Sequence, residues 1–199
     1  MLFRSLVVDW DGTVTVRDSL VQVIHEFGDP ALLAELEPRV GVDLTLHEEI
    51  ALEFRAITTP LAEVARWVVR HVEVRAGLHE LASLEPVVIS AGFHELIEPV
   101  LARERVELEV LANRLDVRSD GWVVHFRDEN VCATCGEPCK RASVAGEPYV
   151  YVGDGYSDRC AALAAERIFA RDALATHLDH LGVAYERFYD LHDVANALR

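Results

Sequence analysis

A short apolar segment that ends in a turn carrying two aspartates constrains this chain more than any other feature. Residues Leu2 to Val8 are predicted to form a buried strand, and they lead directly into Asp9-Trp10-Asp11-Gly12-Thr13. Residues i and i+2 of an extended segment point the same way, so Asp9 and Asp11 place two carboxylates side by side. Two adjacent carboxylates repel each other unless a cation lies between them or one holds a proton. The segment therefore predicts a metal site and an aspartate nucleophile beside an acid/base partner.

The only lysine of the chain also indicates a polar site. Of the 19 basic residues 18 are arginine, and Lys140 precedes a second acidic cluster, Gly153-Asp154-Gly155-Tyr156-Ser157-Asp158. Lysine carries a compact, strongly hydrated charge that arginine does not reproduce. Its isolation favours a role that needs an ammonium group, with a chance distribution of basic residues as the alternative.

Net charge and hydropathy limit the kinds of partner that the protein is expected to bind. The net charge is −15, which argues against nucleic acid and means that an anionic substrate must be attracted locally. No apolar run reaches the roughly 20 residues of a membrane span, and the first residues do not look like a signal peptide. We therefore expect a cytoplasmic protein, monomeric or homodimeric, that binds neither nucleic acid nor a membrane.

The four cysteines permit two interpretations. Cys132, Cys135 and Cys139 lie close together in the sequence, and Cys160 follows the acidic cluster. In a cytoplasmic protein they are expected to be reduced thiols. Cys132 and Cys135 have the spacing of zinc ligands, but no second pair of this kind is present. The sequence leaves open whether these residues bind zinc or form a loop of free thiols beside the active site.

Strands and helices are predicted to alternate along most of the chain. Helical patterns occupy Asp18 to about Val74, with a capping box at Thr45 and Glu48. Strands are predicted at Pro86 to Ser90, Glu107 to Leu111 and Tyr149 to Val152, and a hairpin joins Leu115 to Arg118 with Trp122 to Phe126. Such alternation predicts an α/β fold, with a parallel sheet covered on both faces and a helical insertion after the first strand.

Three candidate residues directly follow apolar strands, and ligands bind at the carboxyl ends of strands in sheets of this kind. Asp9, Ser90 and Asp154 are therefore expected to converge. Asp9 is the proposed nucleophile, which would attack phosphorus and form an aspartyl phosphate. Asp11 would protonate the leaving alcohol and later remove a proton from the hydrolytic water.

The acids are also the expected ligands of Mg2+, which prefers oxygen. Asp154 and Asp9 would bind the ion together with the backbone carbonyl of Asp11. Asp158 would be a further ligand or would orient its neighbours.

The phosphate group would be bound by neighbouring donors. We expect the Ser90 hydroxyl and the Lys140 ammonium to contact phosphoryl oxygens. The amides of Ala91 and Gly92 would do the same from the N-terminus of the following helix.

These motifs, in this order, resemble those of the haloacid dehalogenase superfamily of phosphatases. Asp9 to Thr13 is similar to the first motif, Ser90 to the second, Lys140 to the third, and Asp154 with Asp158 to the fourth. The resemblance implies a Rossmann-like three-layer core with an inserted all-helical cap, and Mg2+ as cofactor. The expected core comprises residues 1–15 and 75–199, and the expected cap residues 16–74.

A narrower resemblance concerns the substrate. Thr15 to Asp18, Val74 to Leu78, the run ending in Cys139-Lys140, and Phe169 to Asp172 are similar to the phosphoserine phosphatase-like branch. Within it they look most like the methionine-salvage phosphatases that act on 2-hydroxy-3-keto-5-methylthiopentenyl-1-phosphate. This implies a small phosphorylated metabolite as substrate, with Asp18 facing it or capping a helix instead. Phosphoserine or another phosphomonoester, a phosphotransferase reaction, and a zinc-stabilised binding module remain alternatives.

Overall fold

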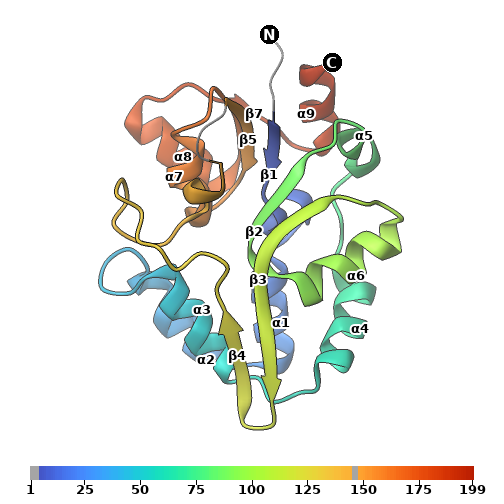
Figure 1. Ribbon diagram of the computed structural model, residues 1–199, viewed down its shortest axis with the longest axis vertical. Coiled ribbons are helices and arrows are strands. Elements are labelled where there is room, and N and C mark those ends of the chain that lie inside the picture. The colour runs from blue at the N-terminus through green and yellow to red at the C-terminus, as the bar shows by residue number, and fades with distance from the viewer. Residues whose placement is uncertain (1–4, 145–147) are drawn as a thin grey trace.

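A seven-stranded sheet runs through the computed structural model, which describes residues 5–144 and 148–199 (Figure 1). The strand order is β4-β3-β2-β1-β5-β6-β7, and all neighbours are parallel except β3 and β4. The strands are β1 (Ser5–Val8), β2 (Val87–Phe93), β3 (Glu109–Arg118), β4 (Gly121–His125), β5 (Tyr149–Gly153), β6 (Arg167–Ala170) and β7 (Glu186–Arg187). The first predicted strand is present from Ser5 onward, and Leu2 to Arg4 lie outside the described residues.

Helices cover both faces of the sheet, as the alternating pattern predicts. Along β1, Leu6 and Val8 join one buried cluster and Val7 joins another, because successive side chains point to opposite faces. The first cluster packs against α5 (Leu78–Ala82), α6 (His94–Glu104) and α9 (Leu191–Leu198), and the second against α7 (Arg159–Ala162) and α8 (Asp172–Leu181). The three-layer α/β architecture is therefore confirmed. No helix in the described parts of the chain is both long and apolar enough to cross a membrane.

Four further helices lie between β1 and α5, in the lower part of Figure 1. They are α1 (Ser19–Phe27), α2 (Pro30–Leu36), α3 (Leu46–Arg55) and α4 (Leu61–His71). The predicted capping box is present at the start of α3, where the Thr45 and Glu48 side chains cap each other's backbone. Thr15 pairs with Val74 where the chain enters and leaves this segment. That pairing supports residues 16–74 as the inserted cap, which we put forward as a proposal.

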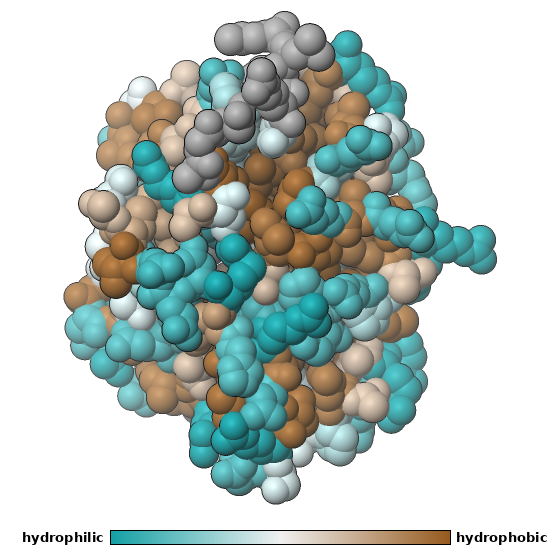
Figure 2. All heavy atoms as spheres, viewed as in Figure 1, coloured by the Kyte–Doolittle hydropathy of each residue, from teal (hydrophilic) through white to brown (hydrophobic). Residues whose placement is uncertain are grey.

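The hairpin differs from the sequence prediction. The strand at Glu107 to Leu111 and the first arm of the hairpin form one continuous strand, β3, which carries β4 down beside α3 (Figure 1). The fully buried Trp122 of β4 lies near Phe54, and its indole N–H donates to the carbonyl of Thr59 at 3.0 Å. Hydrophilic side chains lie over the hairpin turn at the lower end of the view in Figure 2. The hairpin therefore attaches the helical segment to the sheet.

Candidate active site

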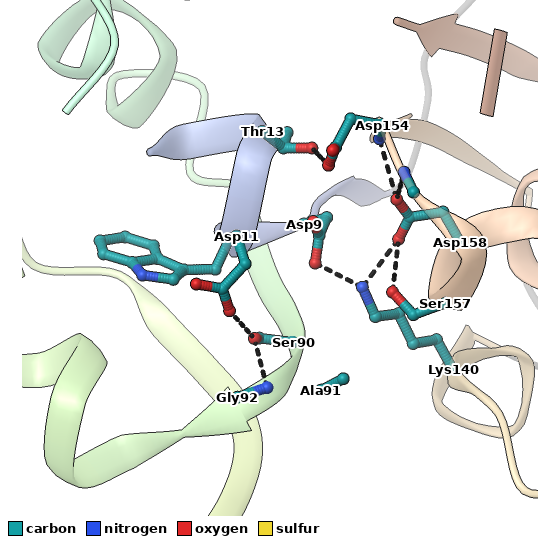
Figure 3. Close-up of polar contacts among 12 residues, drawn as sticks. Asp9, Asp11, Thr13, Ser90, Ala91, Gly92, Lys140, Asp154, Ser157 and Asp158 are labelled. Atoms are coloured by element: carbon teal, nitrogen blue, oxygen red, sulfur yellow. Dashed lines mark hydrogen bonds and ion pairs between the residues drawn. The ribbon is translucent and has the colours of Figure 1, made fainter. Parts of the chain in front are cut away.

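The centre of the site is a buried ion pair between two residues far apart in sequence. Asp9 lies at the carboxyl end of β1, where its N–H donates to the carbonyl of Val152 at 2.9 Å. The Lys140 ammonium contacts the Asp9 carboxylate and lies 2.7 Å from the Asp158 carboxylate (Figure 3). Burial disfavours a charged amine, but the two carboxylates keep the pKa of Lys140 above its ordinary value. Lys140 therefore carries its charge inside the protein.

Three carboxylates gather beside this ammonium. Asp9, Asp154 and Asp158 each place an oxygen within 4.8 Å of the others. The Thr13 hydroxyl fixes Asp154 by donating to its carboxylate at 2.7 Å. Burial and then neighbouring carboxylates raise the pKa of Asp9 to about 7 and that of Asp154 to about 8. A divalent cation would relieve this repulsion, and the set of oxygen donors fits Mg2+.

Asp158 is fully buried, and both of its oxygens already accept hydrogen bonds. One oxygen accepts from Lys140 and from the Tyr151 hydroxyl at 2.8 Å. The other accepts from the backbone N–H groups of Asp154 and Gly155, each at 2.9 Å. These contacts favour the orienting role for Asp158 over direct binding of a metal.

Asp11 points away from this cluster and toward Ser90 (Figure 3). One Asp11 oxygen accepts from the Ser19 hydroxyl and from the Ser19 N–H at 3.0 Å, and the other lies 3.4 Å from the Ser90 hydroxyl. Burial, followed by repulsion from Asp18, raises the pKa of Asp11 to about 7. A carboxyl group that titrates near neutral pH can both give and take a proton.

The segment after Ser90 departs from the sequence prediction. Ala91 and Gly92 were expected at a helix N-terminus, but β2 continues through them to Phe93, and α6 begins at His94. The Gly92 N–H donates to the Ser90 hydroxyl at 2.8 Å, so this amide orients the serine. Regular pairing of β2 with β3 stops at Ile89 and Leu111 and resumes at Phe93 and Asn113, so Ser90 to Gly92 form an irregular, bulged part of the strand.

Arg75 supports the site, and the sequence analysis gave it no role. Its guanidinium is buried and donates to the carbonyls of Gly12 and Thr13, each at 2.9 Å. It also donates to the carbonyl of Thr15 at 3.2 Å. These bonds hold the loop that carries Asp9 and Asp11. The available signal was the run Val74 to Leu78, which contains Arg75 and carried part of the family resemblance.

A chamber of about 450 Å³ opens from the acids toward the helical segment. Asp18 lies at its edge and caps α1 by accepting from the N–H groups of Leu20 and Val21 at 2.8 and 3.0 Å. The wall contributed by the helices is mainly apolar, with Leu20, Val21, Ile24, Leu33, Val40, Leu46 and Ile50. Two buried carboxyls interrupt it, and burial raises the pKa of Glu49 to about 7 and that of Glu53 to about 8.

Residues 6–163 match the family model of haloacid dehalogenase-like hydrolases. A 2-hydroxy-3-keto-5-methylthiopentenyl-1-phosphate phosphatase of Bacillus cereus (strain G9842) is 27% identical, covering 96% of this chain and 94% of that protein. The protein of the same name from Bacillus thuringiensis (strain Al Hakam) is 26% identical with the same coverage.

Solved structures share the fold at lower sequence identity. A substrate-bound phosphoserine phosphatase matches with a TM-score of 0.73 at 15% identity, covering 100% of both chains. Phosphoserine phosphatase from T. onnurineus matches with a TM-score of 0.71 at 17% identity, covering 98% of this chain and 94% of that one. These likenesses establish a common fold.

Proposed function

Because the chain belongs to the haloacid dehalogenase-like hydrolase family, we propose that it is a Mg2+-dependent phosphatase that forms an aspartyl phosphate on Asp9. The buried contact between Lys140 and Asp9, beside Asp154, carries this proposal. An isolated carboxylate would repel a phosphate ester, and a fixed ammonium next to it removes that barrier. The same contact lowers the pKa of Asp9 against the effect of burial, and so favours the ionised carboxylate that a nucleophile requires.

The residues divide the reaction into two steps. An Asp9 carboxylate oxygen attacks phosphorus, and the bond from phosphorus to the ester oxygen breaks. Asp11 gives its proton to the departing oxygen, then takes a proton from the water that attacks the aspartyl phosphate. That second attack breaks the bond between phosphorus and Asp9, releases inorganic phosphate and restores both carboxyl groups.

The other side chains bind and orient. Asp9, Asp154 and the backbone carbonyl of Asp11 would hold Mg2+, which supplies positive charge against the phosphoryl oxygens. Ser90 donates its hydroxyl to the phosphate, while Gly92 fixes the direction of that hydroxyl. Asp158 keeps Lys140 in place.

The chamber favours the methylthio ester among the candidate substrates. By its name, 2-hydroxy-3-keto-5-methylthiopentenyl-1-phosphate has an apolar thioether end and oxygen substituents, but no carboxylate or amine. The apolar wall suits the thioether, and the raised pKa values of Glu49 and Glu53 favour the protonated carboxyls, which can donate to a hydroxyl or keto oxygen. The leaving serine of phosphoserine is polar throughout and would leave that wall in contact with water.

Steady-state phosphate release from both esters tests this choice. We expect kcat/KM for the methylthio ester to exceed that for phosphoserine by at least about 10-fold, since burying even one or two methylene equivalents is worth this much. A preference for phosphoserine would overturn the substrate assignment and leave the phosphatase mechanism intact. Addition of acceptor alcohols, with analysis for new phosphate esters, identifies a phosphotransferase.

A further inference from the structure

All four cysteines meet at one place behind the active site. Cys132, Cys135 and Cys139 lie in the loop between β4 and Lys140, and Cys160 lies on α7. Their four sulfur atoms all lie within 4.8 Å of one another, and none forms a disulfide. The sequence contains only one cysteine pair with the spacing of zinc ligands, because Cys160 joins the cluster through the fold.

The sulfur spacing matches a single tetrahedral metal ion. Zinc–sulfur bonds of about 2.3 Å place the four sulfurs of a tetrahedral site about 3.8 Å apart. The Cys132 and Cys160 sulfurs are 3.8 Å apart. A disulfide requires about 2.05 Å, which none of these free thiols shows. In a four-iron cluster each cysteine binds a different iron. The four cysteine sulfurs then lie farther apart than they do around a single metal ion.

The backbone around Cys132 is shaped to present sulfur ligands. The Gly136 N–H donates to the Cys132 carbonyl at 2.9 Å, and the Cys132 N–H donates to the Glu137 carbonyl at 3.1 Å. Gly136 closes this turn with a φ of +79°, which glycine adopts without strain. The Thr134 N–H points at the Cys132 sulfur at 3.4 Å, a contact that stabilises a thiolate. The pocket that contains Cys135, Cys139 and Cys160 is lined by charged side chains of both signs, Arg127, Arg159, Asp128 and Glu137.

We propose that Cys132, Cys135, Cys139 and Cys160 together bind one Zn2+ ion, which fixes the segment carrying Lys140 against helix α7. Four protein ligands close the coordination shell, so this zinc is structural and takes no part in the chemistry. Cys139 directly precedes Lys140, and Cys160 follows Asp158 on the adjoining helix. The ion therefore joins the two segments whose side chains form the pair between Lys140 and Asp158. Binding is independent of the proposed function, whereas the effect on Lys140 rests on it.

Metal analysis of the full-length protein tests the site without any substrate. Protein produced with zinc in the medium and purified under reducing conditions is expected to contain about one zinc per chain. Cys160→Ser is expected to contain at least about 10-fold less. Thr134→Ala serves as the matched control, since it changes the same loop while keeping every thiol and the backbone amide, and it should retain zinc.

A second measurement avoids dependence on variants that fail to fold. Wild-type protein in which Co2+ replaces Zn2+ at the four cysteines should show the thiolate-to-metal charge-transfer absorption and the intense visible bands of tetrahedral cobalt. The proposal is overturned if these bands are absent, if iron replaces zinc, if Cys160→Ser keeps its zinc, or if the intact mass reports a disulfide.

Zinc removal then tests the positioning of Lys140. After chelation and restoration of Mg2+, we expect an unchanged circular dichroism spectrum and a loss of about 10- to 100-fold in kcat/KM, recovered with stoichiometric Zn2+. Loss of folded enzyme would lower kcat alone. Displacement of Lys140 also raises KM, because its ammonium would contact the substrate phosphate. An unchanged KM would overturn the positioning role, and a normal zinc content in a protein without phosphatase activity would overturn the proposed function alone.

Discussion

At the scale of single residues, the turn after β1 depends on the absence of a side chain at Gly12. This residue has a φ of +76°, and a Cβ there would overlap the Asp154 carboxylate. We predict that Gly12→Ala displaces Asp154, weakens Mg2+ activation and lowers kcat at least about 10-fold. The strain of a left-handed alanine should also cost about 1–2 kcal/mol of unfolding free energy.

Gly182→Ala is the matched control for that variant. Gly182 has a φ of +66° at the end of α8, and no heavy atom of residues 5–144 and 148–199 lies within 4 Å of a Cβ built there. It should lose about 1–2 kcal/mol of stability and keep its kcat. Mg2+ activation is measured as the reaction rate at increasing Mg2+ concentrations. Equal effects of the two variants on it would contradict the close approach of residue 12 to the Asp154 carboxylate.

The residues at the strand ends could be predicted, and the residues that hold them could not. Asp9 and Asp154 follow apolar strands, and Lys140 is the only lysine, so each carries a signal in the sequence itself. Arg75 acts on backbone carbonyls, which every residue possesses, so no sequence pattern identifies its partners. The choice between two roles for Asp158 also required the geometry of its hydrogen bonds.

At the scale of elements, helix α3 places a buried acid in the wall of the chamber. Glu53 is 4% exposed, and one of its carboxyl oxygens has no hydrogen-bond partner in the part of the chain that the structure describes. Burial is the largest cause that raises its pKa from the ordinary 4.5 to about 8, and repulsion from Glu49 adds to it. The folded protein therefore holds a proton in a pH range where the unfolded chain has released it.

This proton makes stability depend on pH with a defined sign. Between about pH 4.5 and about pH 8 the folded state binds more protons, so the free energy of unfolding falls as the pH rises. The side chain in Glu53→Gln cannot ionise. We therefore predict that the decrease in the free energy of unfolding over this pH range is smaller in this variant by about 1–3 kcal/mol. Urea unfolding across this range measures the effect. Glu63→Gln, an exposed change on α4, should keep the wild-type profile, and an unchanged slope in Glu53→Gln would contradict the prediction.

Local patterns predicted most elements, and pairing between strands decided the exceptions. The capping box located α3, since each of its side chains caps a backbone group only three residues away. The continuation of β2 through Ala91 and Gly92 could not be predicted, because it rests on an irregular stretch followed by the pairing of Phe93 with Asn113 of a different strand. The single long strand β3 extends into the hairpin, and the hairpin is held by the packing of Trp122 against the helical segment, which is also a contact between distant residues.

At the scale of the whole molecule, the topology brings distant acids together. β1 lies between β2 and β5, so Asp9 and Asp154, which follow β1 and β5, lie beside Ser90 of β2. The alternation of strands and helices predicted this convergence. The chamber and the cysteine cluster could not be predicted, since they form between segments far apart in the chain. Cytoplasmic location and the oligomeric state stay predictions from the sequence.

Phosphate release from the methylthio ester, by wild-type protein and by Asp9→Asn with and without Mg2+, tests the central claim most directly. We expect turnover only for the wild-type protein with Mg2+, a loss of at least about 10³-fold in Asp9→Asn, and an unchanged fold by circular dichroism. Asp120→Asn, an exposed change in the hairpin turn, should leave the rate unchanged. Equal phosphate release by Asp9→Asn, or full activity of the wild-type protein without divalent metal, would contradict the account.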